Sequence, residues 1–322
     1  MKQFKNVLGT LLAATLLFSS CTKNDDSDMV TRATAEDFNN LREVALENLT
    51  QNFQFNANDG SITLTSQKGV EIIINGACLT LNGNAVTGEV DLEFVEIFER
   101  GQMITTNKPT MGIKPNGDKA LLLTGGAFFV ETTQKGMALE SNCGFQMRIP
   151  ADLTGGVDNE MILWNGIIDE DGNLAWEEME DAAGRGGVFG EGNTYFGFFQ
   201  SFGWSNVDRF YNDPRPKTTI LVAVPEGYNN TNSSVYLSYD GEETGLAQLD
   251  TFDAGTGLFS EHYGQIPIGL ECHIIFATEE GNNWKYAIKS VTIAENDIFT
   301  FTDSETQIAT EAQLTALING LP

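Results

Sequence analysis

The chain has 322 residues, with 45 acidic against 18 basic side chains and a formal net charge of −27. A field of this sign repels nucleic acid and anionic membrane surfaces, so nucleic-acid binding is excluded. The chain contains 33 glycines, 8 prolines and 10% aromatic residues, which is typical of many strands joined by tight turns, and its length favours two domains over one.

The start of the chain has the features of a cleaved signal peptide. Lys2 and Lys5 form a basic head, and an unbroken apolar stretch follows from Val7 to Phe18. About twelve residues of helix rise roughly 18 Å, which is too short to cross a hydrocarbon layer of ~30 Å. We therefore expect residues 1–20 to be removed rather than to remain as a membrane span.

The residues after the apolar stretch resemble the lipobox of bacterial lipoproteins, in which an apolar residue and two small residues precede a cysteine. Here Phe18, Ser19 and Ser20 lead into Cys21. The resemblance implies that Cys21 is diacylated, with fatty acids such as palmitate, and becomes the first residue of the mature protein. Several acyl chains, at ~0.8 kcal/mol per buried methylene, hold a protein stably on a membrane. An ordinary signal peptide with a chance cysteine is the alternative.

Residues 21–34 form a polar, acidic tether. Asp25, Asp26 and Asp28 lie in a run, residues 22–28, that contains no apolar side chain, so this run cannot fold alone. An acidic run so close to the lipidated cysteine resembles the surface-export signal of lipoproteins in the Bacteroides group (Bacteroidota). The resemblance implies an outer-membrane protein that faces the cell surface. With a plain solvated linker instead, the protein would stay on the periplasmic face.

Beyond the tether, the spacing of apolar residues predicts one helix followed by strands. Apolar residues recur every three to four positions over residues 35–50, after a cap at Thr34 or Asp37. From Ser61 onward the period changes to two, which is typical of half-buried antiparallel strands. The alternating segments of this first half are 61–65, 70–74, 89–94 and 145–149.

Part of this region resembles the ZU5-like β modules of bacterial surface lipoproteins, animal ankyrins and netrin receptors. The matching segments are residues 68–74, 88–94 and 121–131, which together cover about a fifth of the chain. Such modules act in interaction and mechanical roles. The resemblance therefore implies a β domain without a catalytic residue.

Residues 164–176 are predicted to form a hairpin, and its turn is the best metal candidate in the sequence. Asp169, Asp171 and Asn173 carry oxygens at odd positions, as in the first half of a calcium loop, and Glu180 stands at position twelve. Asp-Gly-Asn is also an ordinary tight-turn composition. A plain turn is therefore the preferred interpretation, with a calcium site as the alternative.

We place the domain boundary in the acidic, glycine-rich stretch that follows, because neither period continues there. An N-terminal β domain would then span 35–190 and a C-terminal β-sandwich domain 191–322. Near the start of the second domain, residues 202–210 resemble a Gly-Trp-x-Asn-x-Asp-Arg-Phe signature of uncharacterised lipoproteins of the Bacteroides group. There Trp204 and Phe210 would fill a core, and Asp208 would pair with Arg209 or cap a turn.

Short strands at regular intervals, separated by turn residues, predict a β-sandwich in the second half. A stripe of apolar residues over 311–321 predicts a C-terminal helix packed onto it. The expected fold is therefore all-β, with two antiparallel β-sandwich-like domains, an N-proximal helix and a C-terminal helix. The predicted strands are 219–224, 235–239, 257–262, 270–277, 285–293 and 298–301.

Once Cys21 is acylated, an odd number of cysteines remains: Cys78, Cys143 and Cys272. At most one disulfide can form, so at least one thiol stays free. All three lie in apolar or alternating stretches, where cysteine is usually a small buried hydrophobic residue. Buried free thiols are the preferred expectation, and a Cys78–Cys143 bridge is the alternative.

Acid–base chemistry near neutral pH commonly uses histidine, and this chain has only His262 and His273. Neither belongs to a known catalytic motif, and His273 beside Cys272 lacks the further ligands that a metal site requires. We therefore expect a protein that is not an enzyme and has no cofactor.

The resulting hypothesis is a lipid-anchored envelope lipoprotein that acts as a structural or protein-interaction module, with an envelope protein as its partner. The alternative is a glycan-binding surface lipoprotein, because sugars stack on exposed aromatic faces. That alternative requires two or more exposed tryptophans on one face. The four candidates are Trp164, Trp176, Trp204 and Trp284.

Overall fold

The computed structural model describes residues 32–168, 174–179, 186–261 and 263–322. The segment Arg32–Pro322 forms one compact unit. About half of its described residues lie in β-strands, and α-helices occur at three places, so the expected all-β class with an N-proximal and a C-terminal helix is confirmed. The α-helices are α1 (Ala35–Leu49), α2 (Arg100–Thr105) and α3 (Glu311–Asn319).

Helix α1 begins where the sequence predicts. Thr34 and Asp37 form a reciprocal capping box, in which each side chain accepts a hydrogen bond of 3.1 Å from the backbone N–H of the other residue. This arrangement satisfies N–H groups that would otherwise lack partners in the first turn. Phe38 and Ala45 are buried on the inner face of the helix.

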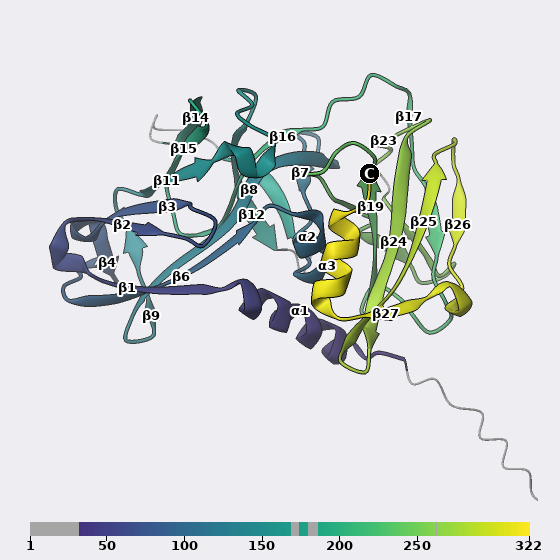
Figure 1. Cartoon of the computed structure of the whole chain (residues 1–322), viewed down its shortest axis with the longest axis horizontal. Helices are drawn as coiled ribbons and strands as arrows, with labels where there is room; N and C mark the ends of the chain where they lie inside the picture. Colours follow the sequence, from purple (N-terminus) through teal and green to yellow (C-terminus); the bar gives the residue numbers. More distant parts are fainter. Residues whose placement is uncertain (1–31, 169–173, 180–185, 262) are drawn as a thin grey trace, which may run out of the picture. The chain divides into compact units, whose positions relative to one another are not determined.

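The first β half, strands β1–β16, is built mainly from an eight-stranded and a five-stranded sheet (Figure 1). In the larger sheet β7 pairs with both β13 and β8, so that part of the sheet closes on itself. Apolar side chains of both sheets meet in one core, including Ile72, Phe94, Phe128 and Met147. The eight-stranded sheet contains β1 (Gln51–Asn56), β6 (Glu89–Ile97), β7 (Met111–Ile113), β8 (Lys119–Gln134), β9 (Met137–Ala138), β12 (Ile162–Ile168), β13 (Leu174–Glu178) and β16 (Gly203–Phe210). The five-stranded sheet contains β2 (Ser61–Thr65), β3 (Glu71–Asn75), β11 (Phe145–Pro150), β14 (Gly187–Glu191) and β15 (Thr194–Phe199). A three-stranded sheet contains β4 (Leu79–Leu81), β5 (Asn84–Ala85) and β10 (Glu140–Ser141).

The strand pairing places residues 187–210 with the first β half. The expected boundary at 190/191 falls in the hairpin β14–β15, and β15 pairs with β11. Strand β16 lies between β8 and β12 of the large sheet. The chain therefore passes from the sheets of the first β half to those of the second after Phe210.

The second β half, strands β17–β27, is a sandwich of a five-stranded and a four-stranded sheet with a short two-stranded piece. Its core contains Val222, Leu237, Phe276 and Phe301. The five-stranded sheet contains β19 (Ser233–Tyr239), β20 (Ala247–Gln248), β24 (Glu271–Glu280), β25 (Asn283–Thr292) and β27 (Gln307–Ala309). The four-stranded sheet contains β18 (Leu221–Ala223), β21 (Thr251–Asp253), β22 (Leu258–Ser260) and β26 (Ile298–Thr300), and the short piece pairs β17 (Lys217–Thr218) with β23 (Ile266–Pro267).

The three α-helices take part in a central core that joins the two halves (Figure 1). Neighbouring residues of β24 serve different cores, because successive strand side chains point to opposite faces: Ile274 packs in the sandwich and Ile275 in the central core. Helices α2 and α3 approach closely at Gly101, where an added Cβ would lie 2.6 Å from the Cα of Thr315. Glycine at this position allows that approach.

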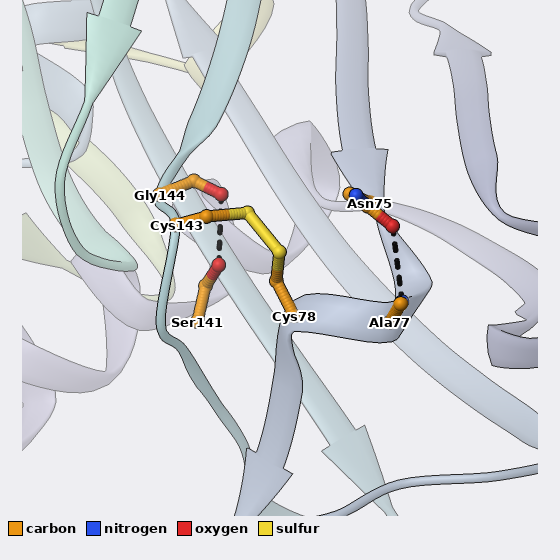
Figure 2. The surroundings of a disulfide bond; sticks show 6 residues. All are labelled: Asn75, Ala77, Cys78, Ser141, Cys143 and Gly144. Carbon is orange, nitrogen blue, oxygen red and sulfur yellow. Dashed lines mark hydrogen bonds between the residues drawn. A yellow bond between two sulfur atoms is a disulfide. The ribbon is translucent and has the colours of Figure 1, made fainter.

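Cys78 and Cys143 form a disulfide with a Cα–Cα distance of 5.8 Å, as Figure 2 shows. The preferred expectation of free thiols is therefore wrong for this pair, whereas Cys272 is free and buried as expected. The reason is strand pairing. Cys78 lies between β3 and β4, Cys143 lies between β10 and β11, and because β3 pairs with β11 and β4 with β10, the two connections lie side by side. Gly144, at φ 68°, turns the chain tightly against the carbonyl of Phe199 directly after Cys143.

Candidate functional site

A recess of about 1010 Å³ lies in the described part of the chain. One wall is the short helix η3 (Ala151–Thr154) with the loop that runs on to Met161, from the first β half. The opposite wall is the turn 241–244 of the second half, and Phe98, Arg100 and Arg209 contribute to the lining. We call this recess the inter-half cleft.

The loop wall of the cleft is held rigidly by Tyr195 and Arg209. The Tyr195 hydroxyl accepts a hydrogen bond of 2.7 Å from the Asp158 N–H and donates one of 3.0 Å to the Gly156 carbonyl. Arg209 Nε donates to Asp158 Oδ2 at 2.5 Å. Partial burial opposes ionisation of Asp158, but the hydrogen bonds from the Glu160 N–H and from Arg209 hold its pKa below the usual value.

Arg100 fixes the opposite end of the lining. It is 1% exposed and donates hydrogen bonds to Ser238 Oγ at 2.5 Å, to the Leu321 carbonyl at 2.7 Å and to the Pro322 carbonyl at 3.1 Å. Burial lowers the pKa of Arg100, and the acids Glu243 and Asp240 act against that shift. The hydrogen bonds of this guanidinium therefore connect α2 to β19 and to the segment after α3.

Four carboxylates of the cleft have no such partner. The side chains of Asp152, Glu160, Glu242 and Glu243 line the cleft and form none of the hydrogen bonds or ion pairs found among the described residues. Burial raises the pKa of Glu242, and the nearby Arg209 acts in the opposite direction. The cleft thus combines an excess of negative charge with walls that hydrogen bonds hold in place. Such a site suits a ligand group that is cationic or donates hydrogen bonds.

The structure does not bring the tryptophans together on the surface. Trp164, Trp176 and Trp284 are at most 1% exposed, and the indole N–H groups of Trp164 and Trp176 donate to the carbonyls of Asp208 and Pro109. Trp204 is partly exposed and packs against Phe129 and Trp176. The condition for a tryptophan-based glycan platform is therefore not met.

Asp208 does not have the role that the sequence suggests. It is completely buried in β16, accepts a hydrogen bond of 2.6 Å from Asn206 Nδ2, and leaves its Oδ1 without a partner. Arg209, which was expected to pair with it, points to Asp158 instead, because successive side chains of a strand face opposite sides. The expectation of an Asp208–Arg209 pair or a turn cap is therefore wrong.

The other candidate residues from the sequence do not form a metal centre within the part of the chain that the structure describes. Asp169, Asp171, Asn173 and Glu180 lie outside them, as do His262 and the expected lipidation site Cys21. The flanking strands β12 and β13 do pair as the predicted hairpin. Within the described ranges, no group of three or more His, Cys, Asp or Glu side chains could hold a metal ion.

His273 is paired with a carboxylate rather than with the neighbouring cysteine. Its Nδ1 lies 2.8 Å from Asp240 Oδ1. Cys272, on the opposite face of β24, is buried, and burial raises the pKa of its thiol to about 12. The two residues therefore do not form a joint site.

Comparison of the sequence with models of known protein families and with curated proteins gives no match. Among the helices of the described residues, none has the length and apolar character needed to cross a membrane.

Proposed function

We propose that the protein is a lipid-anchored lipoprotein of the outer membrane, exposed at the cell surface, and that it acts as a non-catalytic interaction module. In this proposal Cys21 carries the lipid, and the inter-half cleft binds a cationic segment of an envelope protein. The tether is the part of the expected 21–34 segment that precedes the folded unit, because Arg32 pairs with Asp303, Ala33 is buried and Thr34 caps α1. The observation that carries the binding role is the cleft itself, whose walls are braced while four carboxylates remain open.

The Cys78–Cys143 disulfide supports the export part of the proposal. Disulfides form and persist in oxidising compartments such as the periplasm and the cell surface, and they are rare in the reducing cytosol. The basic and apolar leader that ends at Cys21 is consistent with the same destination.

The charge and the volume of the inter-half cleft support a cationic protein segment as its partner. A volume of about 1010 Å³ is at the upper end of typical ligand pockets, enough for several side chains of a partner segment. Arg209 is already paired with the Asp158 carboxylate and does not neutralise the four open carboxylates of the cleft. These four carboxylates would attract lysine or arginine side chains of a partner by electrostatic complementarity.

Binding is tested with the purified full chain and a fluorescent peptide rich in lysine and arginine, measured by anisotropy. The double variant Glu242→Gln/Glu243→Gln is expected to weaken binding about tenfold, because two charge-assisted contacts are lost. The control is Glu47→Gln/Glu295→Gln, which removes the same charge from exposed side chains outside the cleft. An equal loss in both double variants would show that only net charge matters and would reject the cleft.

Anchoring is tested separately in cells. Mass spectrometry of the mature protein is expected to find acyl chains on Cys21, and Cys21→Ala is expected to leave the protein unacylated. Protease added to intact cells should digest the anchored protein. Protection from the protease would place it on the periplasmic face, and an intact, unacylated leader would refute the anchor.

A further inference from the structure

A second recess lies between α1 and the loop after α2, and it is lined by two cations. This pocket, of about 240 Å³, is bordered by Asn39, Arg42, Thr106, Asn107 and Lys108. It shares no lining residue with the inter-half cleft. We call it the Arg42–Lys108 pocket.

Arg42 reaches the pocket from the inner side of α1. Its Nη2 donates to Ser234 Oγ at 2.6 Å and to the Tyr236 hydroxyl at 3.3 Å, and the guanidinium lies 3.8 Å from the centroid of the Phe38 ring. Within the described part of the chain its Nη1 takes part in no hydrogen bond, and its Nε is buried without a partner. Burial lowers the pKa of Arg42, with Tyr236 acting in the opposite direction. All its protein partners are neutral.

Lys108 faces the same pocket from the other side. Its Nζ donates to the Thr106 carbonyl at 3.0 Å and lies 5.3 Å from the centroid of a Trp204 ring. A single carbonyl leaves two of the three ammonium protons unused. Burial, followed by the charge of Arg42, lowers the pKa of Lys108 to about 8. The two cations therefore repel each other across the pocket.

No carboxylate relieves this repulsion. Arg42 and Lys108 take part in none of the ion pairs found among the described residues, although acids outnumber bases 45 to 18 in the chain. Glu43 borders the pocket, but it forms no ion pair with either cation. Burying a charge without a counter-charge is costly, so two partly buried cations left together in an acidic protein indicate a missing anion.

Neutral donors complete the lining. Among the described residues the Asn39 side chain has no hydrogen-bond partner, and Asn107 accepts a hydrogen bond from the Tyr236 hydroxyl at its Oδ1, which leaves its amide N–H₂ unused. A further recess of about 240 Å³ shares Asn39 and Arg42 with this pocket and is also lined by Ser233, Ser234 and Asp250. The Asp250 carboxylate is paired with Lys119. The available groups are thus a guanidinium, an ammonium and two amides, the donor types that bind oxyanions.

We propose that the Arg42–Lys108 pocket binds a small oxyanion, a phosphate, sulfate or carboxylate group. The oxyanion accepts hydrogen bonds from Arg42 Nη1 and Lys108 Nζ, and the amides of Asn39 and Asn107 complete its coordination. Proteins elsewhere use the planar fork of arginine and the point charge of lysine together for such groups.

The test is an NMR titration of Lys108 in the full chain, with lysine side chains isotopically labelled, in the presence of inorganic phosphate, sulfate or acetate. A bound anion is expected to raise the pKa of Lys108 from about 8 toward its ordinary value of 10.5, because the ammonium form gains a counter-charge. The fluorescence of Trp204, which lies against Lys108, should titrate with the same midpoint.

Variants separate a specific site from general attraction. Arg42→Gln and Lys108→Met are each expected to weaken phosphate binding about tenfold, since each removes one charged donor. Lys217→Gln, which removes an exposed lysine without an ion pair, should leave it unchanged. Binding of phosphate and sulfate alone would assign a tetrahedral anion, and binding of acetate as well would extend the site to carboxylates.

The proposal is overturned if the pKa of Lys108 stays at its anion-free value in millimolar phosphate, sulfate and acetate. It is equally overturned if Lys217→Gln weakens binding as much as Lys108→Met. Because the pocket and the cleft share no residue, failure here leaves the cationic-peptide test of the cleft unaffected.

Discussion

Each β half buries a carboxyl group that has a raised pKa and no cationic partner among the described residues, but the two groups are held differently. In the first half, Asp208 is completely buried and bonds to the neutral Asn206 side chain. In the second half, Glu261 is 4% exposed, and the backbone N–H groups of Gln265, Tyr263 and Gly264 act to lower its pKa, although its Oε1 has no hydrogen-bond partner. Burial raises the pKa of both groups, that of Glu261 to about 8. Both sites therefore keep a neutral acid in a folded core.

The halves also differ in their cysteines. A disulfide joins Cys78 to Cys143 in the first half, where the five-stranded sheet meets the three-stranded sheet, whereas Cys272 in the second half lies free in a core. The comparison suggests that the first half depends on oxidation, and that both halves lose stability as their acids are forced to ionise. The following predictions test each part of it.

The largest effect is expected from removal of the disulfide. Cys78→Ala/Cys143→Ala should lower the free energy of unfolding by ~2–5 kcal/mol, because the reduced unfolded chain regains loop entropy. Urea denaturation followed by circular dichroism measures the loss. Reductant should have the same effect on the native protein and none on the double variant. Unchanged stability of the double variant would mean that both halves are closed by packing alone.

The next effect concerns Glu261. Its folded pKa of about 8 lies above the ordinary 4.5, so the stability that its protonated form contributes is complete below pH 4.5 and is lost as pH rises through about 8. Glu261→Gln should therefore be more stable than the native protein above pH 8, by on the order of a few kcal/mol, and equal to it in acid. Thermal unfolding across pH measures this difference. The exposed control Glu271→Gln should show none. A gain that persists in acid would rule out ionisation as its cause.

Asp208 is expected to behave in the same direction. Its folded pKa is raised, so its contribution is complete below the ordinary 3.8 and declines as pH rises toward the folded value. Asp208→Asn keeps the shape and removes the ionisable group, so it should stabilise the protein at neutral pH by ~1–3 kcal/mol. Calorimetry measures the change, with exposed Asp59→Asn as the control. Destabilisation at neutral pH would instead show that the ionised form is the native one.

The smallest effect on stability is expected at Cys272. Burial raises its pKa to about 12, so the thiolate is scarce and the native protein should resist alkylation until it is denatured. Cys272→Ala should cost only ~1 kcal/mol, as for other small core truncations. Mass spectrometry after iodoacetamide treatment gives the result. Fast labelling of the native protein would mean that this core opens readily.

The sequence could predict features that depend on local spacing. Helices α1 and α3, the hairpin of β12 and β13, and the buried state of Cys272 all follow from patterns within short segments. The disulfide depends on β3 lying beside β11, a pairing between residues far apart in the chain. Such pairings leave no local pattern, so the sequence could give the Cys78–Cys143 bridge only as the alternative to free thiols.

Asp208 shows a second reason for failure. The register between β16 and β8 shifts between Asn206 and Asp208, so four consecutive residues from Ser205 to Asp208 are buried. A bulge of this kind breaks the alternation on which strand prediction rests. The inter-half cleft escapes prediction for a related reason. Its carboxylates come from separate segments, and in a chain with 45 acids none of them stands out.

The contact between α2 and α3 has a consequence for the order of folding. Arg100 and Gly101 sit near the middle of the first half, yet their partners are the carbonyl of Leu321 and the side chain of Asn319. In a polypeptide that emerges N terminus first, about two hundred further residues must therefore follow before this guanidinium meets the backbone carbonyls that accept its hydrogen bonds. Until then the surface of α2 stays open, and the early strands can pair without committing the protein to its finished form.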